Sequence, residues 1–142
     1  MDYTQKASDL LEVMQSFRKV KTQINFFEHL QGEMFVLYFI AFHDIKTLPG
    51  IISKEMNVSS ARVAVALNSL ENKGLITRQI AEDDRRKILV EITPAGRVFV
   101  QEHNHLMILQ LSRLLEKLGE NDANELYRLV TRLVEVIPEL LA

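Results

Sequence analysis

The densest charge in this chain lies in one short run, Glu82 to Lys87, where three acidic residues are followed directly by three basic ones. Arginine and lysine side chains neutralise nucleic-acid phosphates, and arginine also binds narrow, electronegative stretches of the minor groove. A run of balanced charge is equally typical of a solvated turn, in which acids and bases compensate each other. The run therefore indicates either a nucleic-acid contact or an ordinary exposed turn.

The residues on both sides of this run predict a β-hairpin with the charge at its tip. Residues 75–80 (LITRQI) and 87–92 (KILVEI) are strand-like in composition and alternation. Thr93 is a good N-cap and Pro94 suits the first helical position, so a helix is expected to run from there to about Leu118. A hairpin tip is narrow enough to reach a DNA groove.

Two short helices are expected immediately before the hairpin. The first covers about 48–56 with Thr47 as its N-cap, and the second runs to about Lys73 with Ser59 or Ser60 as its cap. Two compact helices joined by a short turn form a helix-turn-helix, and the hairpin that follows makes the unit a winged one.

The two ends of the chain predict helices with wide apolar faces. We expect one helix over about 4–27, an almost wholly apolar one over about 33–44, and a last one over 122–141 that begins at Asp122. The stripe of the last helix comprises Leu126, Val130, Leu133, Ile137 and Leu140. A small winged unit cannot bury this surface, so it is covered either by a second copy of the chain or by an intramolecular bundle of the terminal helices.

Bulk composition narrows the class of protein. The chain has 142 residues, 47% of them hydrophobic and 25% charged, which suits one globular domain. The absence of cysteine excludes disulfides, thiol redox sensing and cysteine-ligated zinc. The longest apolar run, Met34 to Phe42, is too short to cross a bilayer, and no signal-peptide pattern opens the chain. We expect a cytoplasmic protein with no membrane partner.

Residues 74–97, GLITRQIAEDDRRKILVEITPAGR, resemble the wing signature of the MarR family of bacterial transcription regulators. The element order of the whole chain also agrees, whereas residues 1–45 and 98–142 match that family in pattern only. The resemblance implies a homodimer with interleaved terminal helices that binds a palindromic operator in double-stranded DNA. It also implies a repressor that is released by a small anionic or aromatic effector.

The same resemblance assigns roles to the charged tip. Arg86 is implied to be the arginine that enters the minor groove, and Asp84 would hold its guanidinium by a charge-assisted hydrogen bond. Arg85 and Lys87 are better placed for phosphates. Arg78, on the first strand, is either a further phosphate contact or a partner for Asp84.

The helix expected to read the major groove is unusually apolar. Its outward DNA-binding positions are predicted to be Ser59, Ser60, Arg62, Val65, Ala66 and Ser69. Arg62 could read a guanine edge, and Val65 or Ala66 could contact a thymine methyl. Residues 48–96 contain seven basic and six acidic side chains, a local net charge of only +1. A winged-helix module for protein assembly, without operator binding, therefore stays open as an alternative.

Other kinds of site find little support. His29 and His43 flank the second helix, and Glu102, His103 and His105 lie further on, in regions where some family members bind zinc. The spacing of His103 and His105 places them on different sides of a helix, so no metal site is expected, and a zinc-responsive regulator of the same fold is the alternative. Aromatic residues that could line an effector pocket, or simply fill the core, are Phe17, Phe26, Phe27, Phe35, Tyr38, Phe39 and Phe42.

No phosphate loop, nucleophile elbow or paired metal-ligand motif is present, so we expect neither an enzyme nor a cofactor. The predicted fold is mainly α with a small β-hairpin (α+β), a winged helix-turn-helix with N- and C-terminal dimerisation helices. Residues 1–142 form a single domain in this interpretation. Residues 33–96 are its winged helix-turn-helix DNA-binding region, and residues 1–30 and 97–142 are its helical dimerisation region.

Overall fold

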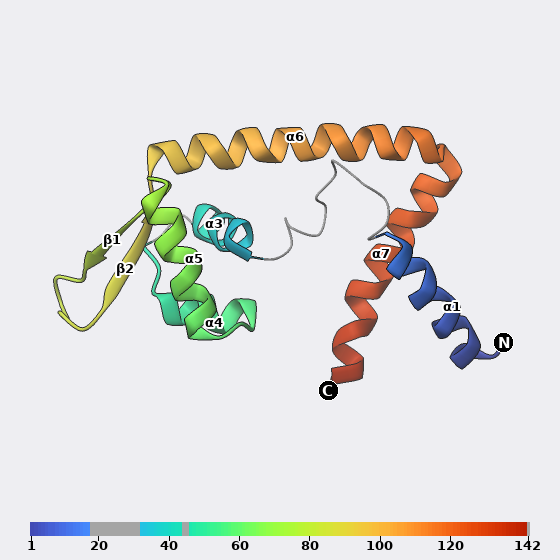
Figure 1. The fold of residues 1–142 in the computed structure, drawn as a ribbon, viewed down its shortest axis with the longest axis horizontal. Helices are drawn as coiled ribbons and strands as arrows, with labels where there is room; N and C mark the ends of the chain where they lie inside the picture. Colours follow the sequence, from blue (N-terminus) through green and yellow to red (C-terminus); the bar gives the residue numbers. More distant parts are fainter. Residues whose placement is uncertain (18–31, 44–45, 142) are drawn as a thin grey trace.

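The computed structural model describes residues 1–17, 32–43 and 46–141, and it confirms the predicted fold class (Figure 1). Helices and one two-stranded antiparallel sheet make up this part of the chain. In chain order the elements are α1 (Tyr3–Ser16), α3 (Gly32–His43), α4 (Pro49–Met56), α5 (Ser60–Asn72), β1 (Ile76–Ile80), β2 (Ile88–Ile92), α6 (Pro94–Leu118) and α7 (Glu120–Leu141).

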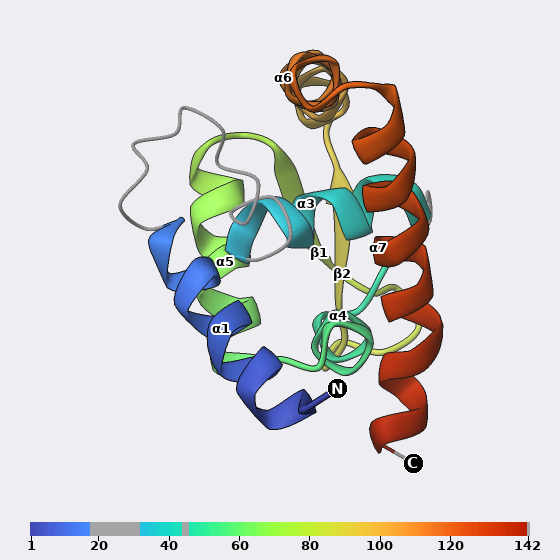
Figure 2. The same cartoon turned by 90° about the vertical axis from the view of Figure 1, so that its right-hand side faces the viewer.

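The long helix α6 separates two groups of elements (Figures 1 and 2). Helices α3, α4 and α5 and the hairpin gather near its first turns, and we call them the winged unit. Helix α7 turns back from the other end of α6, and α1 lies at that end too, away from the hairpin. The chain therefore presents the wing at one extremity and both terminal helices towards the other.

A continuous hydrophobic core holds the winged unit together. Helix α3 contributes Val36, Leu37 and Ile40, and α5 contributes Val63, Leu67 and Leu70 at three- and four-residue spacing. Such spacing places the side chains on one face of each helix. Ile52 of α4 and the inward residues of the hairpin complete the core.

A third segment, before α4, pairs with strand β2 of the hairpin through a single β-bridge. The N–H of Thr47 donates to the Val90 carbonyl at 3.0 Å, and the N–H of Val90 donates to the Thr47 carbonyl at 2.7 Å. Thr47 is buried in this position. The expectation that Thr47 caps α4 is wrong, because the bridge to β2 fixes its backbone and the cap falls on Leu48, which makes no side-chain hydrogen bond.

Thr93 and Gly96 hold the end of the wing against the end of α5, through hydrogen bonds and close packing. The Thr93 hydroxyl donates to the Gly74 carbonyl at 2.7 Å and accepts from the Gly96 N–H at 3.0 Å, which confirms Thr93 as the N-cap of α6. The Thr93 N–H donates to the Leu75 carbonyl at 3.0 Å. A Cβ at Gly96 would lie only 2.1 Å from that carbonyl oxygen, so this close approach requires glycine.

The terminal helices differ from expectation at their bounds. The last helix begins at Glu120 rather than 122, because Gly119, at φ +82°, already provides the break after α6. The helix expected over 4–27 is described only as far as Ser16, and the rest of that prediction lies outside the described residues. Neither α1 nor α7 contains a buried residue among those described. Within the described ranges, every helix is too short or too polar to span a bilayer.

Candidate nucleic-acid interface

The charged run forms the tip of the hairpin and is closed by its own backbone. The N–H of Ala81 donates to the Lys87 carbonyl, and the N–H of Lys87 donates to the Asp84 carbonyl, both at 2.9 Å. Ala81 is buried at the base of this turn, whereas the residues from Glu82 to Lys87 are exposed or half-exposed. The tip is thus a compact turn that presents its side chains to solvent.

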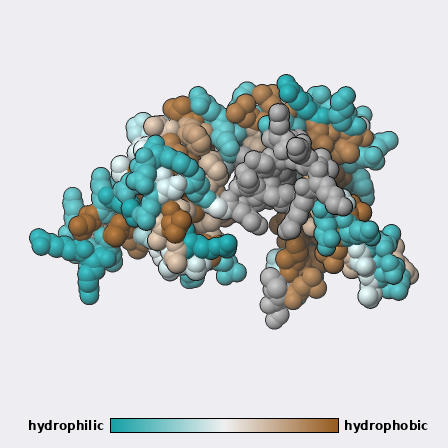
Figure 3. Space-filling view, in the orientation of Figure 1, coloured by the Kyte–Doolittle hydropathy of each residue, from teal (hydrophilic) through white to brown (hydrophobic). Residues whose placement is uncertain are grey.

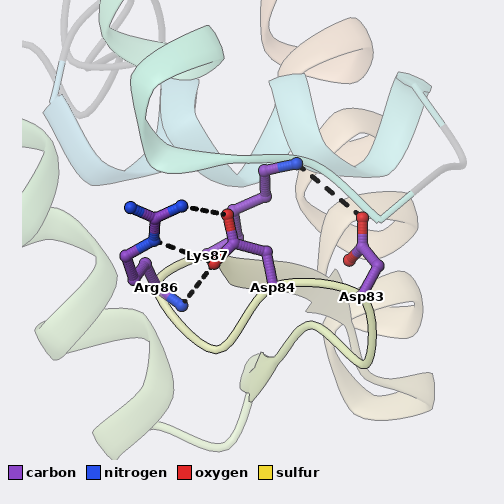
Figure 4. A network of polar contacts seen from close by, with 4 residues as sticks. All are labelled: Asp83, Asp84, Arg86 and Lys87. Carbon is purple, nitrogen blue, oxygen red and sulfur yellow. Dashed lines mark hydrogen bonds and ion pairs between the residues drawn. The ribbon is translucent and has the colours of Figure 1, made fainter.

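Asp84 holds Arg86 through the contact that the sequence predicts (Figure 4). Its carboxylate accepts from the Arg86 backbone N–H at 3.0 Å and from Nε of the guanidinium at 3.1 Å, with Nη2 at 3.4 Å. These hydrogen bonds hold the pKa of Asp84 below its usual value, so the carboxylate stays charged. The Arg86 side chain is nevertheless 91% exposed. One acid therefore orients an arginine that remains open to a partner.

The two other basic residues of the tip differ in their freedom. Nζ of Lys87 lies 3.7 Å from the Asp83 carboxylate (Figure 4), a long contact between two exposed side chains. Arg85 is exposed and forms no ion pair with any residue that the structure describes. Both cations can reach a phosphate at little cost, because exposed ion pairs of this kind are weak.

Helix α5 offers most of the predicted outward residues at its first turns. Ser59 caps the helix by accepting from the Arg62 N–H at 3.3 Å, and Ser60 and Arg62 are exposed. Val65 is 70% exposed, an uncommon degree for a valine on a helix that packs on both sides.

Ala66 and Ser69 do not follow the prediction equally. Ala66 is only 9% exposed, so its placement on the outward face is wrong: it follows Val63 by three residues and precedes Leu70 by four, which puts it on the buried face of α5. Ser69 is half-buried, and its hydroxyl helps to lower the pKa of Glu33 of α3. The exposed surface of α5 is therefore narrower than expected.

Arg78 does not contact Asp84, and that alternative is wrong. Its Nε and Nη2 donate to Oε2 of Glu71 in the last turn of α5, at 2.9 and 2.5 Å. The hydrogen bonds from Arg78 hold the pKa of Glu71 below its ordinary value. Glu71 is not identified from the sequence as a partner of Arg78. The one signal available is the alternation along the strand, which places Arg78 on the same face as Ile76.

An open groove of about 1210 Å³ runs beside the exposed face of α5. It is lined by the start of α3, the end of α4 and α5 residues that include Arg62, Val65 and Ser69. Of the aromatic residues considered for a pocket, Phe35 lies in its wall, Tyr38 and Phe39 pack against the core, and Phe17 and Phe42 are exposed. Phe26 and Phe27 lie outside the described residues.

His43 and His103 are engaged in local contacts, whereas His105 is exposed. The His43 ring stacks on Phe39, and its Nδ1 lies 2.9 Å from the Phe39 carbonyl oxygen. His103 Nδ1 lies 3.2 Å from the Tyr38 hydroxyl. Across residues 1–17, 32–43 and 46–141, no three histidine or acidic side chains converge as metal ligands, and His29 lies outside these ranges.

Comparison with known proteins finds a family model that matches part of the chain and solved structures with a similar fold. Residues 31–87 match the family model described as MarR family. The fold is similar to that of YusO from Bacillus subtilis, with a TM-score of 0.70 and 22% identity over 95% of this chain and 98% of that one.

Two further solved structures share the fold. FabT of Streptococcus pneumoniae, crystallised in complex with DNA, has a TM-score of 0.64 and 21% identity over 98% of this chain and 99% of its own. MepR, a transcription regulator of the Staphylococcus aureus multidrug efflux pump MepA, has a TM-score of 0.67 and 18% identity over 91% of this chain and 97% of its own.

Proposed function

We propose that this chain, which belongs to the MarR family of winged helix-turn-helix DNA-binding transcription regulators, binds a palindromic operator as a homodimer and represses transcription. The observation that carries the proposal is the tip of the wing, where Asp84 orients an Arg86 side chain that is 91% exposed. FabT, which shares the fold, was crystallised in complex with DNA, and this supports DNA binding by the present chain.

The wing and α5 would divide the contacts with DNA between two grooves. Arg86 would enter the minor groove, where a narrow A/T-rich segment attracts arginine, while Arg85 and Lys87 bind the flanking phosphates. Helix α5 would enter the major groove with Arg62 towards a guanine edge, Ser59 and Ser60 near the backbone, and Val65 against a thymine methyl. With a net charge of only +1 over residues 48–96, this interface would depend strongly on shape and apolar contacts.

Dimerisation would supply the second half-site. Residues 33–96 form the DNA-binding region in this proposal, and residues 1–30 and 97–142 form the dimerisation region. The apolar residues of α1 and α7 are exposed in the single chain, which supports a second copy as their cover. A twofold dimer presents two recognition helices to half-sites about one helical turn apart.

Release by a small anionic or aromatic ligand completes the proposal. The groove beside α5 supports it, because Arg62 and Val65 in its wall would be shared between ligand and DNA. A ligand that binds only the DNA-free form lowers operator affinity by mass action.

The decisive experiment selects bound fragments from the source genome and measures the best duplex by mobility shift at low salt. We expect Arg86→Ala to weaken binding to all sequences and to lower the slope of log K against log salt by about 1. Arg62→Ala should cost about 1–3 kcal/mol at one base position and relax specificity there.

Arg113→Ala, the same change at an exposed position on α6, is the matched control and should leave binding unchanged. Arg86→Lys separates charge from shape, because lysine keeps the cation but loses the planar fork that Asp84 orients. If the wild-type protein selected no fragment at low salt, the assembly-module alternative would replace operator binding.

A further inference from the structure

One ion pair joins the two elements that the proposed function sends into different grooves. Glu71 lies in the last turn of α5, and Arg78 lies in the middle of β1. Both guanidinium hydrogen bonds, at 2.9 and 2.5 Å, end on the same carboxylate oxygen. The two side chains are 37% and 29% exposed, so water screens them only in part. We call this pair the α5–β1 clasp.

The register of the hairpin fixes the direction of Arg78. Residues directly opposite each other in an antiparallel pair point to the same face of the sheet. Arg78 lies opposite Val90, which is fully buried, so the arginine stem leaves the strand on the face that packs against the core. Thr77 and Gln79 point the other way and are exposed. A side chain that starts on the inner face and ends on Glu71 is directed along the protein surface rather than outward from it.

The clasp spans the turn that joins α5 to β1, and Thr93 binds the base of that turn as well. The end of α5 is a Schellman motif, in which the Leu75 N–H donates to the Leu70 carbonyl at 3.0 Å and the Gly74 N–H to the Glu71 carbonyl at 2.9 Å. Gly74, at φ +72°, then turns the chain into β1. Arg78 is bound further along the strand than this turn. Its contact with Glu71 therefore restrains the angle between α5 and the hairpin.

The charges of the pair also argue against a phosphate contact by Arg78. A guanidinium that donates twice to one carboxylate leaves almost no net positive charge for a phosphate. The cations at the tip are different, because Arg85 has no ion pair among the described residues and Arg86 is exposed although it is oriented. Arg78 thus belongs with the framework of the interface and not with its contact surface.

We propose that Glu71 and Arg78 are positioning residues, which hold the wing at the angle to α5 that lets both elements meet their grooves at once, and that Arg78 does not bind phosphate. This rests on the proposed function, since it assigns the spacing of the two DNA-contacting elements. The wing angle itself exists without DNA, so one test needs no duplex.

The test without DNA measures the distance between α5 and the wing tip. The chain has no cysteine, so cysteines introduced at Asn68 and Glu82, both exposed, carry the only spin labels. Labelled chains are mixed with excess unlabelled chains, so that a dimer contains at most one labelled protomer. We expect a narrow distance distribution that broadens or shifts in Glu71→Ala and in Arg78→Ala. An unchanged distribution in both variants would overturn the proposal.

The charge-swapped double variant, Glu71→Arg with Arg78→Glu, keeps the total charge and can form the pair in reverse. We expect it to recover a narrow distribution, whereas a general loss of structure would not be repaired by a second change. Glu55→Ala, which removes an exposed acid of α4, is the matched control and should leave the distribution narrow. Circular dichroism spectra and melting curves check that each variant is folded.

The test with DNA uses the tightest duplex from the fragment selection and an unrelated duplex of equal length. We expect Arg78→Ala and Glu71→Ala each to weaken binding by about three- to tenfold, as for a half-exposed hydrogen-bonded charge pair. The double variant Glu71→Ala with Arg78→Ala should lose no more affinity than either single variant, because both changes break the same pair. The salt slope of Arg78→Ala should equal that of the wild type, whereas Arg85→Ala should lower it by about 1.

A phosphate contact by Arg78 gives the opposite signs. Arg78→Ala would then lower the salt slope, and Glu71→Ala would tighten binding because it frees a cation and removes an acid near DNA. That pair of results would overturn the positioning role. If the wild-type chain bound neither duplex, the proposed function would fail, while the spin-label distances would still decide whether the clasp sets the wing angle.

Discussion

The winged unit and the terminal helices use the same amphipathic patterns with opposite results. Every hydrophobic residue that the structure describes as buried lies between Val36 and Val100. Helices α1 and α7 contain none, although hydrophobic side chains gather along α7 (Figure 3). An apolar stripe predicts that a helix face will be buried, but it does not tell whether the same chain provides the cover.

The boundary between the part of the chain with a buried core and the part with exposed apolar side chains lies within helix α6. The first turns of α6 belong to the winged unit, because Gly96 and Val100 are buried there. Further along the same helix, Leu106, Ile108 and Leu109 are exposed. Helix α6 therefore links a core that the chain closes by itself to an apolar surface that is exposed in the single chain.

The largest expected effect comes from the closed core. Leu67 of α5 is 1% exposed, so Leu67→Ala removes buried methyl groups and leaves a cavity, which should cost about 2–5 kcal/mol of unfolding free energy. Urea denaturation followed by circular dichroism measures this value. Val65→Ala, on the same helix at a position that is 70% exposed, is the control and should cost far less. A loss below about 1 kcal/mol for Leu67→Ala would contradict the view that this core holds the winged unit together.

The next effect addresses the open surface. Leu133→Asp places a charge in the middle of the exposed stripe of α7, and a buried unpaired carboxylate opposes association strongly. We expect the dissociation constant of the dimer to rise at least about a hundredfold, which corresponds to about 2.7 kcal/mol. Light scattering and sedimentation at micromolar concentration measure it, with Glu135→Gln on the same helix as the control. An unchanged mass would mean that α7 is covered in another way, and a monomeric wild type would end the dimer proposal.

The parts of the fold that the sequence predicts correctly depend on neighbours along the chain. Ser59 caps α5 and Thr93 caps α6 because each reaches an N–H three residues ahead. The two strands flank a turn that closes on itself. The prediction of Thr47 as a cap is wrong for the opposite reason, because its partner Val90 is distant in sequence and a tertiary bridge replaces the local cap.

The candidate site divides in the same way. The contact of Asp84 with Arg86 spans two residues and is what the resemblance of the wing implies, whereas the contact of Arg78 with Glu71 joins two elements and no pattern in the sequence indicates it. Ala66 turned inward because α5 packs against both α3 and α4, which widens its buried face beyond the stripe that the sequence indicates. Which of these residues contact DNA stays a prediction until binding is measured.

A smaller effect is expected at the joint where the winged unit meets α6. In Gly96→Ala the added Cβ would lie 2.1 Å from the Leu75 carbonyl oxygen and 2.7 Å from the Ile92 side chain. Because the nearest atom is backbone, the first turn of α6 or the start of β1 must shift, at a cost of about 1–3 kcal/mol. Thermal unfolding measures this cost. Ala95→Gly, next to it on an exposed position, is the control, and equal melting temperatures for the wild type and Gly96→Ala would contradict the close approach.

The smallest expected effect on stability concerns two ion pairs, one in the winged unit and one in the terminal helix α7. Lys73 at the end of α5 donates to Glu33 of α3, and this hydrogen bond is the main cause of a lowered Glu33 pKa. Both side chains are partly exposed, so after solvent screening the pair contributes less than about 1 kcal/mol. Glu125 and Arg128 form the matching pair within α7, and there too the hydrogen bond lowers the glutamate pKa.

The direction of the pH dependence follows from the lowered Glu33 pKa. In the unfolded chain Glu33 titrates near its ordinary value of 4.5, and in the folded chain it titrates lower. The folded state therefore gains stability from this carboxylate above pH 4.5 and loses it as the pH falls through the lowered pKa. We expect the unfolding free energies of the wild type and Glu33→Gln to differ at neutral pH and to converge in acid. Glu33→Gln removes the carboxylate charge from a contact between two helices, whereas Glu125→Gln removes it from a contact within a single helix. Only Glu33→Gln should therefore also increase amide hydrogen exchange where α3 meets α5, and equal exchange in both variants would contradict a tertiary role for the pair.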